Sequence, residues 1–539
     1  MFAMPSTRVN VRRDNRERVG MSAVAIFTRT ASRWALALAA ATSIGACASL
    51  DRFVSDTEPE VVVPESPSDQ PDGTPDWVEF APDALPSTDW VADFGSPQLS
   101  MLVSDGLSRN PRVLQALAQF DASLAQRRIS RADLYPSLNL NGSASRNEGG
   151  AGSFSSSTSY SLGLNASWEL DLWGQVRDRV NAAEAGAWAS AADLAALRLS
   201  IAGQVVNSWL DAIEADLLID LSDRSIEAQQ RVLRITQRRF EAGLVGASDV
   251  RLARSTLADF QATRELRLQN RNATLRNLQN LLRLYPDARL DVPDALPRLP
   301  VLEGAAGPDW VLARRPDLLA AEARIAQAGF NVDVARKALL PSITLSAGAS
   351  EETVVREDPT TGETVGSLGD IFDLQEVAYN LAGRLLAPIF QGGRLRAQVE
   401  AQRAQLAAQL EAYVQTVLTA YTEVENALDA EARLAARSDA LRVSLENARA
   451  AEDRLQTRYV EGLATILQLL DAQTRSLNAE GQLIGAEAER LANRVRLHVA
   501  LGGGRFGEVF PVPEPVPVIS APDLPLLGAL ESVSSDGLG

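Results

Sequence analysis

The sequence has almost none of the residues that build most enzyme and metal sites. Its 539 residues include one cysteine, Cys47, and one histidine, His498. No disulfide can form within the chain. A zinc centre or a Ser-His-Asp triad would have to be built around that single histidine. Lysine is nearly absent too, because Lys337 is the only one among 52 basic residues. We therefore expect no enzyme activity, no bound metal and no cofactor.

Excess positive charge and long apolar runs are also missing. The 52 basic residues are outnumbered by 69 acidic ones, which gives a formal net charge of −17. Nucleic-acid binding needs clustered basic residues to neutralise phosphates, so this balance argues against it. The apolar run WALALAAATSIGA at 34–46 is shorter than the roughly 20 residues that a membrane-spanning helix needs.

This apolar run indicates a targeting segment. Arginines precede it, and it ends in Ile44-Gly45-Ala46-Cys47, which resembles a bacterial lipobox, where small residues precede an acylated cysteine. We predict a lipoprotein signal peptide at 1–46, starting at Met1 or Met21, and a covalent lipid, including palmitate, on Cys47. By resemblance to lipoprotein sorting, Ala48 after the cysteine implies the outer membrane. The alternative is a signal peptide with an incidental cysteine.

Between two proline-rich ends, the sequence contains two similar copies of one unit. LYPSLNLNGSAS at 134–145 aligns with LLPSITLSAGAS at 339–350, and RRFEAGL at 238–244 aligns with TRYVEGL at 457–463. The offset between the copies grows within 351–370, as a surface insertion would cause. Self-similarity in one order indicates a duplicated unit. The predicted divisions are an acylated tether at 47–89, repeats at 90–300 and 301–505, and a proline-rich tail at 506–539.

Each copy contains two long helical stretches. They are expected at 175–240 and 248–284 in the first copy, and at 393–459 and 464–501 in the second. Leucines recur every seven residues, for example Leu268, Leu275 and Leu282, which predicts helices packed side by side as coiled coils. A helix of about 65 residues would extend roughly 100 Å.

Each copy also contains two segments in which apolar and polar residues alternate. They are expected as strands at 137–145, 158–172, 342–350 and 377–389. Strands of about 9–11 residues with one apolar face, and with Trp or Tyr near their ends, are typical of transmembrane β-barrels. The alternative is a pair of soluble hairpins packed on the helices.

Four strands cannot close a barrel, and open edges are not tolerated in lipid. About eight strands are needed for a filled barrel, and more for an aqueous lumen. Two chains would supply 2 × 4 = 8 strands, and three would supply 3 × 4 = 12, so the chain is expected to oligomerise. The predicted fold class is mainly α with a transmembrane β-barrel part, built from a duplicated helix–strand–strand–long helix–long helix unit.

Several motifs together carry a family resemblance over about 90–505. They are the lipobox, the strand starts PSL (136–138) and PSI (341–343), the strand-to-helix joints DLWGQVR (171–177) and PIFQGGR (388–394), and the two glycine turns. The sequence resembles the TolC-type outer-membrane efflux proteins, in particular their acylated NodT-like branch. The resemblance implies a homotrimer that shares one 12-stranded barrel in outer-membrane lipid and a 12-helix periplasmic tunnel. It also implies two partners, a periplasmic adaptor (membrane fusion) protein and an inner-membrane RND-type pump.

The resemblance further implies that the two glycine turns form the periplasmic tip that contacts the adaptor. A glycine can take the left-handed conformation that ends a helix, and this capping role alone is the alternative. The residues concerned are Arg239, Phe240, Gly243, Leu244, Arg458, Tyr459, Gly462 and Leu463.

Leu467 and Asp471 resemble the periplasmic gate of the family. They are four residues apart, hence on one helix face, and would form an apolar ring and an acidic ring around a threefold axis. A carboxylate ring attracts cations and repels anions. The alternatives are seam packing for Leu467 and a solvated first-turn acid for Asp471. In the first copy, Asp249 after Ser248 indicates helix capping.

The function expected from this resemblance is a passive outer-membrane exit duct for small molecules such as drugs and toxic compounds. Two alternatives stay open. One is an exit duct for type I protein secretion, and the other is a periplasmic lipoprotein scaffold of coiled coils without a pore.

Overall fold

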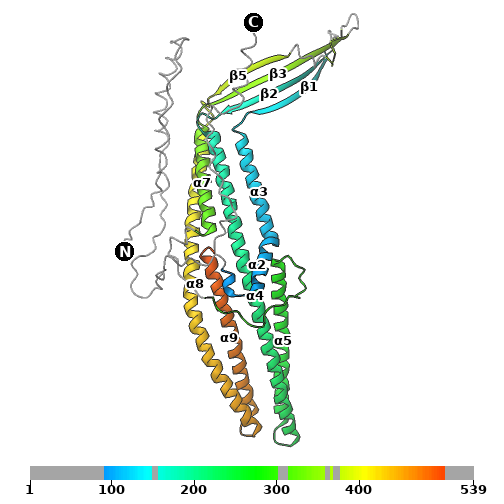
Figure 1. The fold of residues 1–539 in the computed structure, drawn as a ribbon, viewed down its shortest axis with the longest axis vertical. Helices are drawn as coiled ribbons and strands as arrows, with labels where there is room; N and C mark the ends of the chain where they lie inside the picture. Colours follow the sequence, from blue (N-terminus) through cyan, green and yellow to red (C-terminus); the bar gives the residue numbers. More distant parts are fainter. Residues whose placement is uncertain are drawn as a thin grey trace, which may run out of the picture.

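The computed structural model describes residues 90–148, 156–300, 314–357, 364–367, 369 and 377–503. Cys47, the predicted signal peptide and tether, and the predicted tail at 506–539 lie outside the described residues. The described part is elongated, with a sheet at one end and long helices that run away from it (Figure 1).

The two copies have helices of equal length. In each copy a 22-residue helix precedes the strands, a 67-residue helix follows them, and a 35-residue helix returns antiparallel to it. At 1.5 Å per residue the longest helices extend about 100 Å. The pairs are α3 (Pro111–Ala132) and α7 (Pro316–Lys337), α4 (Gln175–Glu241) and α8 (Arg394–Val460), and α5 (Ala247–Leu281) and α9 (Ile466–Ala500).

The short helices stack end to end beside the long ones. The stack of α7 and α9 lies between α4 and α8, whereas the stack of α3 and α5 lies on the other side of α4 (Figure 1). Equivalent hydrogen bonds join the stacked ends: Asn110 Nδ2 donates to the Leu281 carbonyl at 2.8 Å, and Arg315 Nη1 donates to the Ala500 carbonyl at 2.9 Å. Each copy therefore contributes one long helix and one stack of short helices.

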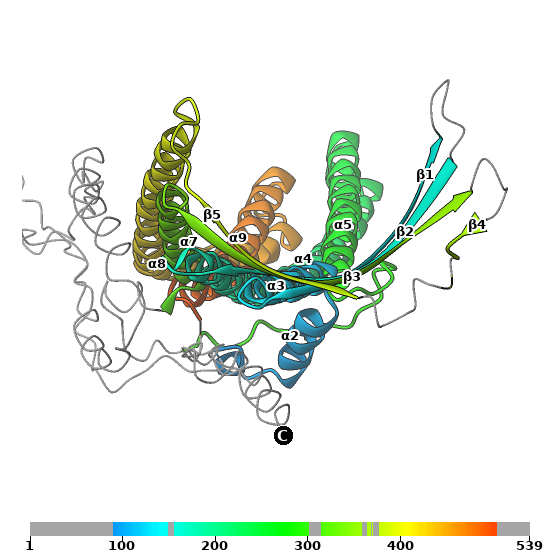
Figure 2. The same cartoon turned by 90° about the horizontal axis from the view of Figure 1, so that it is seen from above.

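The strands form one antiparallel sheet in the order β1-β2-β3-β5, which curves above the helices (Figure 2). β3 continues through residues 351–357, within the predicted surface insertion at 351–370, because this stretch pairs with β2 as far as Arg356. The strands are β1 (Ser137–Glu148), β2 (Ser156–Leu170), β3 (Ser342–Glu357), the short β4 (Thr364–Val365), which pairs with the end of β3, and β5 (Ala378–Leu386).

The register separates an apolar face of the sheet from a polar one. One row across the strands is Leu140, Leu164, Ala349 and Tyr379, and the adjacent row is Asn139, Asn165, Gly348 and Asn380. Successive side chains point to opposite faces, so the two rows lie on different sides. Among the described residues, β1 and β5 each pair with a single strand, so both edges of the sheet are open.

The largest apolar core lies at the waist, where the short helices meet end to end. The segment before α2 (Pro97–Arg109) includes a 3-10 turn, η1 (Ala92–Phe94), and packs with α2 on one face of α4. Trp90 and Phe94 contact this core, and Trp209 on α4 is 1% exposed within it. Only α4 among the described helices has a stretch long and apolar enough to cross a bilayer, and half of that stretch is buried. Packing at the waist explains its composition.

Candidate functional site: the hairpin tips and the aperture

The two hairpin tips have the same backbone geometry. Gly243 and Gly462 have φ of 73° and 81°. In each turn the glycine N–H donates to the carbonyl three residues back, and the following N–H donates to the carbonyl five residues back: Gly243 to Phe240 and Leu244 to Arg239, Gly462 to Tyr459 and Leu463 to Arg458. This pattern is the Schellman motif, which favours glycine because the left-handed conformation has no Cβ penalty there.

The tips present apolar side chains to solvent. Leu244 is 68% exposed and Leu463 is 64% exposed, and Phe240 is also exposed. Tyr459 differs from the expectation of a surface contact, because its side chain is 2% exposed. It packs in a small core with Val232 and Leu469. Tyr459 lies at the tip but not on its surface.

Tyr459 joins the hairpin of one copy to the hairpin of the other. Its hydroxyl lies 2.7 Å from Thr236 Oγ1 on α4. Arg239, also on α4, donates to the Tyr459 carbonyl and holds its guanidinium 4.9 Å from the ring centroid. Arg239 therefore positions Tyr459 from the neighbouring hairpin, and the two tips are held together.

The predicted gate residues stand at the start of α9. A capping box starts this helix: the Gln468 N–H donates to Thr465 Oγ1, and Thr465 N–H donates to the Gln468 side chain. Leu467 is 65% exposed. Asp471 is exposed and accepts a hydrogen bond at 2.9 Å from Arg475 one turn later. Its carboxylate is therefore partly neutralised within the chain.

The first copy starts its return helix differently. Gly246 is the N-cap of α5 and has no side chain to accept a hydrogen bond. Ser248 and Asp249 were expected to cap this helix, but Ser248 donates to the Asp249 carboxylate at 3.3 Å instead. The capping box is thus a feature of the second copy, where the predicted gate lies.

Glu480, which lies farther from the tip than Asp471, links α9 to the two neighbouring helices α4 and α8. Glu480 accepts from Arg224 on α4 at 2.9 Å and from Arg449 on α8 at 2.8 Å. Burial acts to raise the pKa of Glu480, but the hydrogen bonds from Arg449 and Arg224 outweigh it, and the pKa is lowered. The charged form is therefore the one that holds the helices together.

Sequence reasoning missed Thr236, Arg224, Glu480 and Arg449. Thr236 and Tyr459 are 223 residues apart, and Arg224 and Glu480 are 256 apart, so no local spacing points to either contact. Within the part of the chain that the structure describes, no group of three His, Cys, Asp or Glu residues could hold a metal ion.

Solved structures with the same fold define the class of protein. The outer-membrane channel OprN superposes with a TM-score of 0.71 at 27% identity, over 83% of this chain and 99% of that one. The open state of the Neisseria gonorrhoeae MtrE outer membrane channel gives a TM-score of 0.68 at 29% identity, over 82% and 98%. The fold is therefore that of a TolC-like outer-membrane channel.

Sequence comparison gives the family. The family model described as "Outer membrane efflux protein" matches residues 102–284 and 308–503, one segment in each copy. The pyoverdine export outer membrane protein OpmQ of Pseudomonas aeruginosa is 32% identical over 78% of this chain and 88% of its own length. The probable efflux pump outer membrane protein TtgC of Pseudomonas putida is 30% identical over 77% and 85%. The chain belongs to the outer membrane efflux protein family.

This assignment confirms the predicted family, the outer-membrane location and the role as an efflux channel. Channels of this kind work within tripartite efflux systems, and the family is one of transport channels rather than of enzymes. The scaffold without a pore is therefore not supported.

Proposed function

We propose that three copies of this chain close head to tail into one 12-stranded barrel and one helical tunnel, which conduct small molecules from a periplasmic adaptor and an RND-type pump to the exterior. The observation that carries this proposal is the pair of unlike open edges on each protomer. One edge is made by β1, α3 and α5, and the other by β5 and α8. Unlike edges associate heterologously, and such contacts form a ring when the rotation closes.

Apolar side chains on the two edges support this pairing. Leu266 on α5 is 56% exposed and Val443 on α8 is 60% exposed. Leu266 comes 19 residues after the start of α5, and Val443 comes 17 residues before the end of α8; both of these helix ends are at the tip. At 1.5 Å per residue both stand roughly 25–30 Å above the tip. The two residues are thus at one height on opposite edges, as a contact between neighbouring copies requires.

Cysteine cross-linking tests the ring. A chain carrying both Leu266→Cys and Val443→Cys should form covalent dimers and trimers on mild oxidation, and the ladder should end at the trimer. Each single variant is the matched control and should give only monomer on a denaturing gel. A double variant that stays monomeric, or a ladder that passes the trimer, would contradict the proposal.

The periplasmic end is the proposed gate and adaptor contact. The exposed Phe240, Leu244 and Leu463 offer apolar docking contacts, and Leu467 and Asp471 are the proposed constriction. In planar bilayers, Leu467→Ala together with Asp471→Ala should raise the conductance of the closed channel. Arg433→Ala on α8 is a control, because it removes another exposed residue away from the tip. Equal conductance in both variants would exclude the gate.

The remaining assignments concern the anchor and the cargo. A lipid on Cys47 would hold the chain at the membrane independently of the strands, and Cys47→Ala should abolish labelling by a palmitate analogue. The names of the relatives include export of pyoverdine and efflux of toluene and antibiotics, which supports small organic molecules as the cargo of this duct. No cofactor is proposed beyond the lipid.

A further inference from the structure

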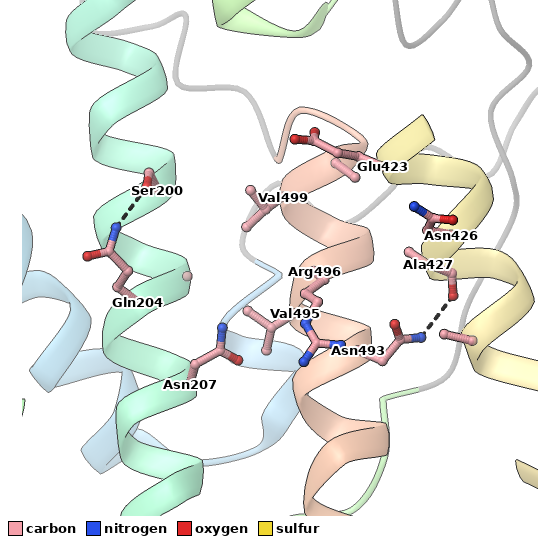
Figure 3. Close-up of a pocket in the computed structure, with 13 residues that line it drawn as sticks. Ser200, Gln204, Asn207, Glu423, Asn426, Ala427, Asn493, Val495, Arg496 and Val499 are labelled. Carbon is pink, nitrogen blue, oxygen red and sulfur yellow. Dashed lines mark hydrogen bonds between the residues drawn. The ribbon is translucent and has the colours of Figure 1, made fainter. Parts of the chain in front are cut away.

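A cavity of about 450 Å³ lies at the waist between α4, α8 and α9 (Figure 3). Ser200, Gln204 and Asn207 line it from α4. The waist core uses a different face of the same helix, which carries Val205 and Trp209. On α4 the cavity therefore uses a different face from the waist core, whereas on α9 it adjoins that core through Val495 and Val499.

The lining combines an apolar floor with convergent polar groups. Gly203 brings α4 close to α9, because a Cβ there would lie 2.9 Å from Val499. Val499 is half-buried and gives the floor its accessible surface, and the buried Val495 lies beneath it. Asn207 Oδ1 is inaccessible to solvent and has no hydrogen-bond partner in the described structure. An apolar surface with a few polar groups that fix orientation is the usual construction of a small-molecule site.

The cavity lining includes one basic residue, Arg496, and one acidic residue, Glu423. Arg496 on α9 is exposed and stands with Asn207 at one end of the cavity (Figure 3). It forms no ion pair within 4.0 Å among the described residues. Glu423 pairs at 2.7 Å with the buried Arg315, which also pairs with Asp317 at 2.8 Å. The guanidinium of Arg496 is thus free to meet an anion.

Asp211 is the acid that competes for Arg496. It lies one turn below Asn207 on α4, where its side chain is exposed but partly desolvated by neighbouring atoms; this desolvation raises the pKa of its carboxyl, and the charge of Arg496 opposes that rise. The next acid on this face, Glu214, also has a raised pKa, through burial first and then through repulsion by Asp211 and Glu489. Glu489 itself pairs with Arg437 at 3.0 Å. Because Asp211 forms no ion pair with Arg496 within 4.0 Å, an incoming anion could bind the guanidinium directly, and the charge of Asp211 would weaken that binding.

We propose that this cavity is a transit site for organic anions with an apolar body, with the anionic group on Arg496 and the body on the floor of Gly203, Val495 and Val499. The site makes Arg496 a determinant of cargo specificity. It rests on the proposed duct, because this face becomes an inner wall only when the ring is closed.

Binding of a charged pair of probes tests the site. Calorimetry with the full chain in lipid nanodiscs, corrected with empty nanodiscs, should show binding of naphthalene-2-sulfonate and weaker binding of naphthylmethylammonium. Arg496→Gln should weaken sulfonate binding about tenfold, because a charge-assisted hydrogen bond is lost. Arg496→Lys should keep most of the affinity, and Asp211→Asn should tighten binding by removing the competing acid.

Two further variants distinguish the effect of the cavity volume on binding from the effect of charge. Ala430→Leu at the half-buried edge should weaken binding of the sulfonate by filling space, with no change in charge. Arg433→Gln removes an exposed arginine outside the cavity and should leave binding unchanged. Tighter binding of the cationic probe, or an unchanged affinity in Arg496→Gln, would overturn the proposal. A preparation that conducts in planar bilayers but fails this test would refute the site alone, whereas a non-conducting one would refute the duct.

Discussion

The return helices of the two copies have the same length but different surroundings. Of 35 residues each, α9 buries fifteen and α5 buries five. α9 lies between α4 and α8, whereas α5 packs mainly on α4. Its few buried apolar residues are supplemented there by ion pairs of Arg264 with Asp223 and of Arg271 with Asp216. The duplicated helices therefore have separate roles: one is the centre of the protomer and the other is its edge.

This difference can be tested by exchanging residues between the copies, because α5 and α9 align at one offset of 219 residues. The largest effect is expected from truncating a buried leucine on α9, because the truncation leaves an empty space in the packing. Leu469 on α9 is 0% exposed, and its counterpart on α5, Val250, is 8% exposed. Leu469→Ala should lower the free energy of unfolding by about 2–5 kcal/mol and Val250→Ala by less than about 2 kcal/mol. Thermal unfolding followed by circular dichroism would measure both, and equal losses would remove the distinction between centre and edge.

The next largest effect is a loss of stability at low pH. His498 stacks on Trp90 with ring centroids 5.4 Å apart. Burial first, and the charge of Arg494 second, lower the pKa of His498 from 6.5 to about 4. The unfolded chain therefore binds the proton more readily, and stability should fall as the pH drops from about 6.5 to about 4, by up to about 3 kcal/mol.

His498→Gln installs the residue that the first copy has, Gln279, and should remove this part of the pH dependence. The check is a series of melting temperatures at pH 7, 5.5 and 4.5 for both proteins. Parallel curves for the two proteins would show that His498 does not titrate in this way.

A smaller effect is expected at Glu480, which links α4, α8 and α9 through Arg224 and Arg449. Glu480→Gln again installs the first-copy residue, Gln261, and leaves Arg224 and Arg449 without their shared carboxylate. Both arginines are about half exposed, so the loss should be only about 1–2 kcal/mol. Because the folded pKa of Glu480 is lowered, the stabilisation is present above the unfolded value of 4.5 and is lost as the pH falls through the folded pKa. A variant as stable as the wild type at pH 7 would argue against this link.

The smallest effect is expected at the tip. Tyr459→Phe installs Phe240 of the first copy and removes the hydroxyl contact with Thr236, at a cost of about 1 kcal/mol. Thr236 keeps its bond to the Val232 carbonyl at 2.9 Å, and the ring still faces Arg239. The variant should leak more ions in planar bilayers, because the hairpins are held together less firmly. The reciprocal Phe240→Tyr, on an exposed side chain, should change nothing.

Local patterns carried much of the fold. The absence of proline and the sevenfold leucines led to long helices at 175–240 and 393–459, which are observed as Gln175–Glu241 and Arg394–Val460. Alternation located the strands, but not the continuation of β3 beyond Ser350, since that depends on pairing with β2 as far as Arg356. A strand end fixed by a distant partner leaves no local signal.

The sequence predicted the site only where a single local segment determines the backbone conformation. Glycine turns at 243 and 462 follow from the left-handed conformation that a helix end requires. The burial of Tyr459 does not follow, because it depends on Thr236 and Arg239 of α4 meeting Tyr459 at the tip, 223 and 220 residues away in the chain. In the aligned sequences Tyr459 and Phe240 occupy equivalent positions. Likewise no sequence motif marks Arg496, because its proposed role depends on the cavity that α4, α8 and α9 form together.

The end-to-end joints at Asn110 and Arg315 constrain how such a chain can evolve in length. Each long helix runs beside two short ones that meet at the waist, so a turn added to α4 alone would leave its neighbours too short to cover it. A longer version would need insertions of the same size in both arms of both hairpins. Single insertions are tolerable mainly at the waist, where connecting segments leave the helices. The length of the helical part is therefore far harder to change by mutation than the length of the connecting segments at the waist.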